Sequence, residues 1–116
     1  MLEKPTFVQG LFAFTGAGLA KPVAFAPPVM YKVPFDKRAQ VIYFRAGNPA
    51  AEMVYVVLAR RSKPMRYFPV AAKGSLHVPL AVIEDLDPET TVEAWVAAPE
   101  GLQSSVVLDI GFVEIG

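Results

Sequence analysis

The stretch "MVYVVLARRSKPMRYFPV", residues 53–70, consists of two apolar runs separated by a short basic segment. Val, Tyr and Phe favour extended strands, because their side chains pack well on a pleated surface and lose freedom in a helix. Ser, Lys and Pro between the runs are typical of a tight connection. The stretch therefore predicts two neighbouring strands joined by a hairpin turn at "RRSKP".

The eleven prolines extend this interpretation to the whole chain of 116 residues. Proline lacks the amide donor and disrupts helix interiors, so few intervals could hold a long helix. "NPAAEM" at 48–53 could form at most one helical turn. We predict one all-β domain over residues 1–116, an antiparallel β-sandwich of jelly-roll-like form. Runs rich in Val, Ile, Tyr and Phe predict about eight strands, near 6–14, 29–33, 39–46, 53–61, 64–70, 75–83, 91–98 and 104–115.

Charge is scarce and unevenly distributed. Charged residues make up 19% of the chain, against a usual share of about 25%. All eleven Lys and Arg residues lie within 1–73 with three acids, and the other eight acids lie within 74–116. We expect acidic strands to lie beside basic ones, within a subunit or between subunits.

Strand alternation predicts which side chains point away from the core. Trp95 shares its parity with Glu93, and His77 alternates with apolar neighbours, so both should lie on outer faces. "MVYVVLA" and "VIYF" are apolar on both faces, as in strands that are covered on both sides. A loop, a terminal segment or a second subunit could supply that cover. We favour a second subunit, and hence a homo-oligomer.

The outer-face aromatic and polar residues are the candidates for ligand binding. A carbohydrate or a small anionic ligand could stack on aromatic rings and be held by arginine. The candidate residues are Tyr43, Tyr55, Trp95, Arg45 and His77. Asp109 lies within the apolar run "SVVLDIGFVEI", and we expect a salt link to an arginine such as Arg45.

Catalytic, metal and cofactor sites find little support. The chain has one histidine and no cysteine, and Ser75 is simply the neighbour of His77 on one strand face. Asp85, Asp87 and Glu89 lack the spacing of a calcium loop. "TGAGLAKP" at 15–22 lacks the spacing of a phosphate-binding loop. We therefore predict no catalytic residue, no metal and no cofactor.

The basic segment at 60–66 is interpreted as a charged turn. A nucleic-acid domain would normally be basic overall, whereas this chain has a pI of about 6.6. We expect no nucleic-acid partner. Pairing with the acidic stretch "EDLDPETTVE" of a neighbouring subunit is a further alternative.

The N-terminal apolar segment is predicted to be a strand. Lys21 and Pro22 end the apolar run "GLFAFTGAGLA" at 10–20, which argues against a membrane span and against a signal peptide. The absence of cysteine is compatible with a reducing compartment, and we expect a cytoplasmic protein.

Three functions are consistent with these patterns. The first is a non-catalytic, self-associating β-sandwich that acts as a structural or interaction subunit. The alternative is a small binding module, and the general pattern is similar to that of small jelly-roll modules, including carbohydrate-binding ones. The third, a hydrolase-like enzyme centred on His77 and an acid, has the least support.

Overall fold

The computed structural model describes residues 3–80 and 84–116, and this part of the chain forms strands and turns without a helix. The strands are β1 (Glu3–Thr15), β2 (Val23–Lys32), β3 (Arg38–Gly47), β4 (Val54–Arg60), β5 (Lys63–Val70), β6 (Ser75–Pro79), β7 (Asp85–Leu86), β8 (Thr91–Ala97) and β9 (Gln103–Ile115). Every strand pair is antiparallel. The predicted all-β antiparallel fold is confirmed.

The predicted strand positions agree closely with the observed ones, with three differences. β2 begins at Val23, ahead of the predicted start, because Pro27 and Pro28 lie where the pairing with β8 is irregular. Proline is tolerated at such a bulge, since no ladder donor is needed there. The two-residue β7 was not predicted, and β6 ends at Pro79, before the predicted end. Residues 50–52 form bends, in agreement with the prediction of at most one helical turn over 48–53. Of the predicted strand 75–83, residues 81–83 lie outside the described residues.

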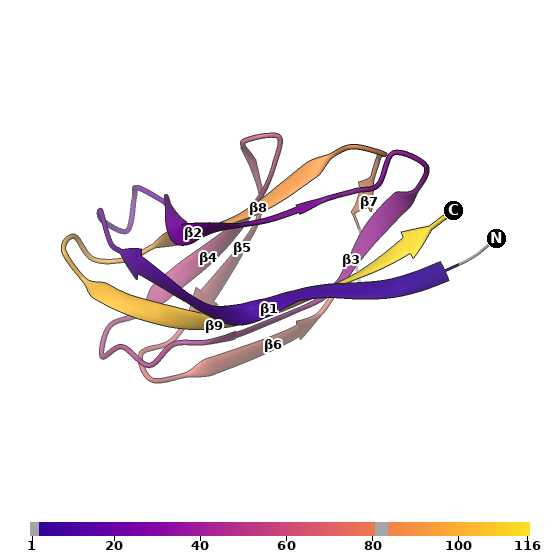
Figure 1. The fold of residues 1–116 in the computed structure, drawn as a ribbon. Helices are drawn as coiled ribbons and strands as arrows, with labels where there is room; N and C mark the ends of the chain where they lie inside the picture. The colour runs from indigo at the N-terminus through magenta and orange to yellow at the C-terminus, as the bar shows by residue number, and fades with distance from the viewer. Residues whose placement is uncertain (1–2, 81–83) are drawn as a thin grey trace.

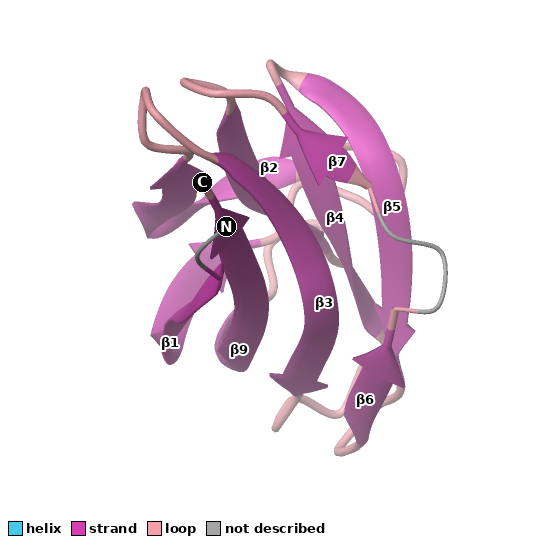
Figure 2. Ribbon diagram, turned by 90° about the vertical axis from the view of Figure 1, so that its right-hand side faces the viewer, coloured by secondary structure: helices cyan, strands magenta, loops and turns pink. Residues whose placement is uncertain are grey.

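The strands follow one hydrogen-bonded path in the order β5-β4-β8-β2-β1-β9-β3-β6, with β7 beside β3. The sheet curls into a nearly closed, barrel-like form with two walls (Figures 1 and 2). We call β1, β9, β3 and β6 the first wall, and β5, β4, β8 and β2 the second wall. Neither the sandwich nor the jelly-roll detail of the prediction is confirmed, because one continuous path of paired strands runs through both walls.

The two walls join only weakly between β1 and β2. Among the described residues, the register pairs these strands at Ala13 and Ala26 alone. Beyond that pair the two strands diverge (Figure 1). On its other side, β1 is paired with β9 along its whole length, from Glu3 opposite Ile115 to Thr15 opposite Gln103.

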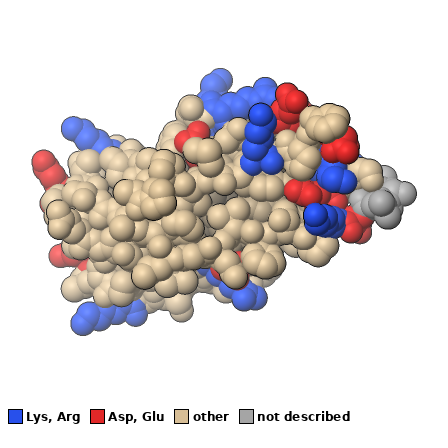
Figure 3. Space-filling view, in the orientation of Figure 1, with Lys and Arg blue, Asp and Glu red and all other residues tan. Residues whose placement is uncertain are grey.

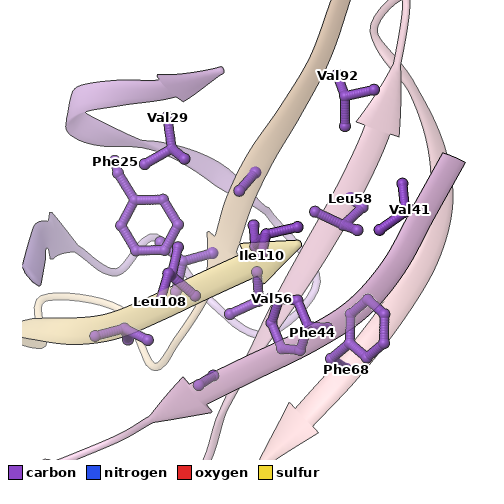
Figure 4. Close-up of a cluster of buried hydrophobic side chains, with 14 of the residues drawn as sticks. Phe25, Val29, Val41, Phe44, Val56, Leu58, Phe68, Val92, Leu108 and Ile110 are labelled. Carbon is purple, nitrogen blue, oxygen red and sulfur yellow. The ribbon is translucent and has the colours of Figure 1, made fainter. Parts of the chain in front are cut away.

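The core fills the space between the walls. Phe44 of β3 stacks on Phe68 of β5 with ring centroids 4.0 Å apart, which links the inner faces near the two ends of the path. Figure 4 shows apolar side chains from both walls converging on this interior. The predicted inward residues of β8, Val92, Ala94 and Val96, belong to the same buried cluster.

The basic turn lies beside the acidic stretch of the same chain. Arg61 and Ser62 form the turn between β4 and β5, both with positive φ, so the predicted hairpin is confirmed. The Arg60 guanidinium lies 3.8 Å from a Glu84 carboxylate oxygen, and that of Arg38 lies 3.6 Å from Asp85. The expected contact between acidic and basic segments therefore forms within one subunit.

The outer face of β4 is also covered within the chain. Val57 is fully buried although it lies on this face, between its cross-strand partners Tyr67 and Trp95. The Tyr55 hydroxyl donates to the carbonyl oxygen of Leu19 in the β1–β2 connection. The apolar side chains on both faces of "MVYVVLA" are therefore covered without a second subunit.

Candidate functional site

The outer face of the first wall presents three rows of side chains that run across four strands. Each row takes one residue from β1, β9, β3 and β6 in turn, as the pairing registers place them side by side. The polar row is Gln9, Asp109, Arg45 and His77. The aromatic row is Phe7, Gly111, Tyr43 and Pro79, and the small row is Leu11, Val107, Gly47 and Ser75.

Asp109 is the centre of the polar row. Its Oδ1 accepts a hydrogen bond of 2.8 Å from the Tyr43 hydroxyl, and its Oδ2 lies 3.8 Å from the Arg45 guanidinium. The expected salt link between Arg45 and Asp109 is confirmed. Burial, followed by the hydrogen bond to Asp109, raises the pKa of Tyr43, so this phenol stays protonated and keeps donating.

The Tyr43 ring contacts neighbours on β9, β3 and β6. A side-chain atom at Gly111 would lie 1.9 Å from the Tyr43 ring, so the ring rests directly on the bare glycine backbone. The Arg45 guanidinium carbon lies 5.1 Å from the centroid of this ring, and His77 meets it edge-on at 6.3 Å. Cation–π and edge contacts of this kind fix the orientation of the polar row.

A groove of about 560 Å³ opens between the polar row and the small row. Gly47 and Ser75 leave room beside the larger Arg45 and His77. The groove is lined by Gln9, Arg45, Ala46, Gly47, Ser75, Leu76, His77, Val107, Leu108 and Asp109. The groove thus combines hydrogen-bond donors, hydrogen-bond acceptors and an apolar surface, as small-molecule sites do.

The five residues predicted for ligand binding fall into two groups. Tyr43, Arg45 and His77 lie together on the first wall, whereas Tyr55 and Trp95 lie on the outer face of the second wall. Trp95 points outward as predicted, is half-buried, and its indole nitrogen is 3.4 Å from a Glu93 carboxylate oxygen. One ligand site cannot use all five side chains.

Sequence reasoning did not single out Gln9, Val107 or Phe7 as members of this face. Alternation along β1 and β9 does place each of them on the same face as its neighbours two residues away. Only the register between β1 and β9, however, brings Gln9 beside Asp109 and Leu11 beside Val107.

The remaining site types find no support in the part of the chain that is described. Residues 3–80 and 84–116 contain no group of three or more His, Cys, Asp or Glu side chains placed to hold a metal ion. Within the same ranges, no helix is long and apolar enough to cross a membrane. No family model matches the chain, and no curated protein matches its sequence.

Proposed function

We propose that the protein is a non-catalytic interaction subunit that self-associates through the open edge of β1. The observation that carries this proposal is the backbone pairing of β1, which among the described residues pairs with β2 only at Ala13. The edge along residues 6–11, beyond Glu3, Lys4 and Pro5, therefore offers backbone donors and acceptors to a further strand. Such edges are ready templates for pairing with another chain.

The side chains of this edge favour association. Phe7 is 58% exposed and Leu11 is 66% exposed, so each leaves a large apolar surface in water. From Thr6 to Thr15 the strand carries no Asp, Glu, Lys or Arg. Proteins commonly protect free edges with charges, and this stretch has none. Figure 3 shows few charged side chains in the middle of the molecule, in the view where β1 and β2 diverge.

A second copy of the chain is the occupant that we favour. Two β1 strands can pair antiparallel about a twofold axis, which buries the same apolar side chains of both copies and closes both edges at once. An edge strand from a different protein would leave the β1 edge of a purified sample unpaired. The mass of the purified protein therefore distinguishes the two occupants.

Light scattering on the purified protein should give twice the monomer mass of 12.6 kDa. Phe7→Lys should shift the protein to monomer, because a charge would then have to be buried at the paired edge. Tyr67→Lys is the matched control, since Tyr67 is also 58% exposed but lies on β5 of the second wall. This control should keep the wild-type mass.

Amide hydrogen exchange gives an independent measurement. Protection of residues 6–11 should rise with protein concentration, while that of β5 stays constant. A wild-type protein that remains at the monomer mass, or equal dissociation in both variants, would contradict the proposal.

A further inference from the structure

We propose that the groove of the first wall binds a neutral sugar, a function separate from self-association. The groove has a size suited to a small ligand, about 560 Å³, within the range of roughly 300–1,000 Å³ that ligand pockets occupy. Its side chains come from four strands and not from a loop. Sites on such rigid elements are held more precisely than sites on loops.

The polar row matches the chemistry of hydroxyl groups. Arg45 only donates hydrogen bonds, Asp109 only accepts them, and Gln9 does both. A sugar hydroxyl both donates and accepts hydrogen bonds. Two adjacent hydroxyls can therefore bind a donor such as Arg45 and an acceptor such as Asp109 at the same time. The Arg45 side chain is 55% exposed, and its ion pair with Asp109 is long, at 3.8 Å, so guanidinium donors face solvent.

The charges of the row disfavour an anion. Asp109 lies beside Arg45 and offsets its charge, so an anion bound to the guanidinium would also face a carboxylate. Like charges this close repel one another. A neutral ligand meets no such repulsion, and the Asp109 carboxylate becomes an acceptor for its hydroxyls.

The apolar side of the groove suits the C–H faces of a sugar ring. Val107 is about half exposed and lines the groove beside Gly47. The C–H faces of a sugar ring can pack on such a surface while its hydroxyls reach the polar row. Tyr43 fixes Asp109 from behind through its hydroxyl, so little ordering is needed when the ligand binds.

The test is a titration of isotope-labelled protein, followed by the backbone amide signals. The probes are the methyl glycosides of glucose, galactose and mannose, with acetate and inorganic phosphate as anions. At least one glycoside should shift the amide signals of Arg45, His77 and Val107, and added salt should not weaken this effect. Shifts by the anions in preference to the sugars would overturn the proposal, and so would the absence of shifts with every glycoside.

Three variants localise the effect. Arg45→Gln should lower the affinity for the glycoside at least about tenfold, because it removes charged hydrogen bonds. Ser75→Leu should do the same by filling the groove, while every member of the polar row is kept. Arg38→Gln is the matched control: Arg38 also lies on β3 with a half-exposed side chain, but it pairs with Asp85 away from the groove. Equal losses in Arg38→Gln and Arg45→Gln would contradict a site in the groove.

The monomeric Phe7→Lys protein separates this proposal from the previous one. Phe7 does not line the groove, and all the lining residues, including Gln9 of β1, are unchanged, so the variant should bind the glycoside as the wild type does. If it is monomeric and still binds, both proposals hold. If the wild-type protein binds the glycoside but does not dimerise, only the proposed self-association is contradicted.

Discussion

At the scale of single residues, Asn48 shows how a polar side chain can replace backbone pairing. It is only 2% exposed, and its amide nitrogen lies 2.8 Å from the carbonyl oxygen of Glu52 and 3.3 Å from those of Val70 and Ala71. Its amide oxygen accepts from the Ala50 backbone at 3.0 Å. Asn48 thereby ties the β3–β4 connection to the end of β5. The sequence "NPAAEM" resembles a helix start because Asn serves both as a helix cap and as a turn residue.

Asn48→Ala should therefore destabilise the fold by about 1–3 kcal/mol, because buried carbonyl groups lose their donor. Urea unfolding followed by the fluorescence of Trp95 measures this. Gln103→Ala, at an exposed position of β9, is the control and should stay within about 0.5 kcal/mol of the wild type. Equal changes in both variants would show that Asn48 has no special structural role.

A second residue-scale feature is the buried Glu114 at one end of the core. Tyr31 stacks on Phe112 with ring centroids 4.2 Å apart and donates a hydrogen bond of 2.6 Å to Glu114. Burial, together with the hydrogen bond and the negative charge of Glu114, raises the pKa of Tyr31 far above its ordinary value. The folded protein therefore strongly disfavours the Tyr31 phenolate.

This raised pKa predicts a loss of stability in alkali. The unfolded chain releases the Tyr31 proton near pH 10, while the folded chain retains it. The stabilisation is thus complete below about pH 10 and declines as the pH rises further. Urea midpoints across this range should fall less steeply for Tyr31→Phe than for the wild type. Tyr67→Phe, which changes an exposed phenol, is the control and should keep the wild-type slope.

At the scale of elements, the β4–β5 hairpin shows what a sequence predicts and what it leaves open. Ser, Lys and Pro predicted a turn after Arg60, but they did not predict that its two residues would have positive φ angles. Arg61 and Ser62 adopt φ values of 51° and 65°, a region that costs side chains other than Gly, Asn and Asp some free energy. Two-residue hairpins favour this geometry because it fits the right-handed twist of the strands.

Replacing the turn by Asn-Gly, as Arg61→Asn with Ser62→Gly, should therefore stabilise the protein by up to about 1 kcal/mol. Thermal unfolding measures the change. Ser105→Gly within β9 is the opposite control: it should destabilise, because a glycine weakens a strand interior. A neutral or destabilising turn variant would show that the present turn is already relaxed.

The strands themselves were largely predictable, and the site only in part. Alternation on β3 puts Tyr43 and Arg45 on one face, and alternation on β6 turns His77 outward. Their convergence depends on which strands pair and in which register, and that is decided by contacts distant in sequence. The same alternation selected Tyr55 and Trp95, yet strand order places these two on the other wall.

At the scale of the whole molecule, the basic first part and the acidic second part of the sequence form ion pairs with each other. Basic residues of β3 and β4 meet acidic residues from the second half of the chain, in the pairs Arg38–Asp85, Arg45–Asp109 and Arg60–Glu84. These side chains are mostly solvent-accessible, so each pair stabilises the fold only slightly, by about 0–1 kcal/mol. The Arg45–Asp109 pair also favours the observed register of β3 and β9, since a slipped strand would separate the two charges.

The pairing of β1 with β9 also affects the order in which the protein can form. Glu3 and Ile115 are register partners, and among the described residues β2 pairs with β1 only at Ala13. During synthesis on the ribosome, β1 therefore stays unpaired with its main partner until β9 has emerged. Contacts so distant in sequence slow folding, because a long loop must close before they form. A nascent chain would thus expose the apolar β1 strand for most of its synthesis, which makes it a natural client for chaperones that hold unfolded segments.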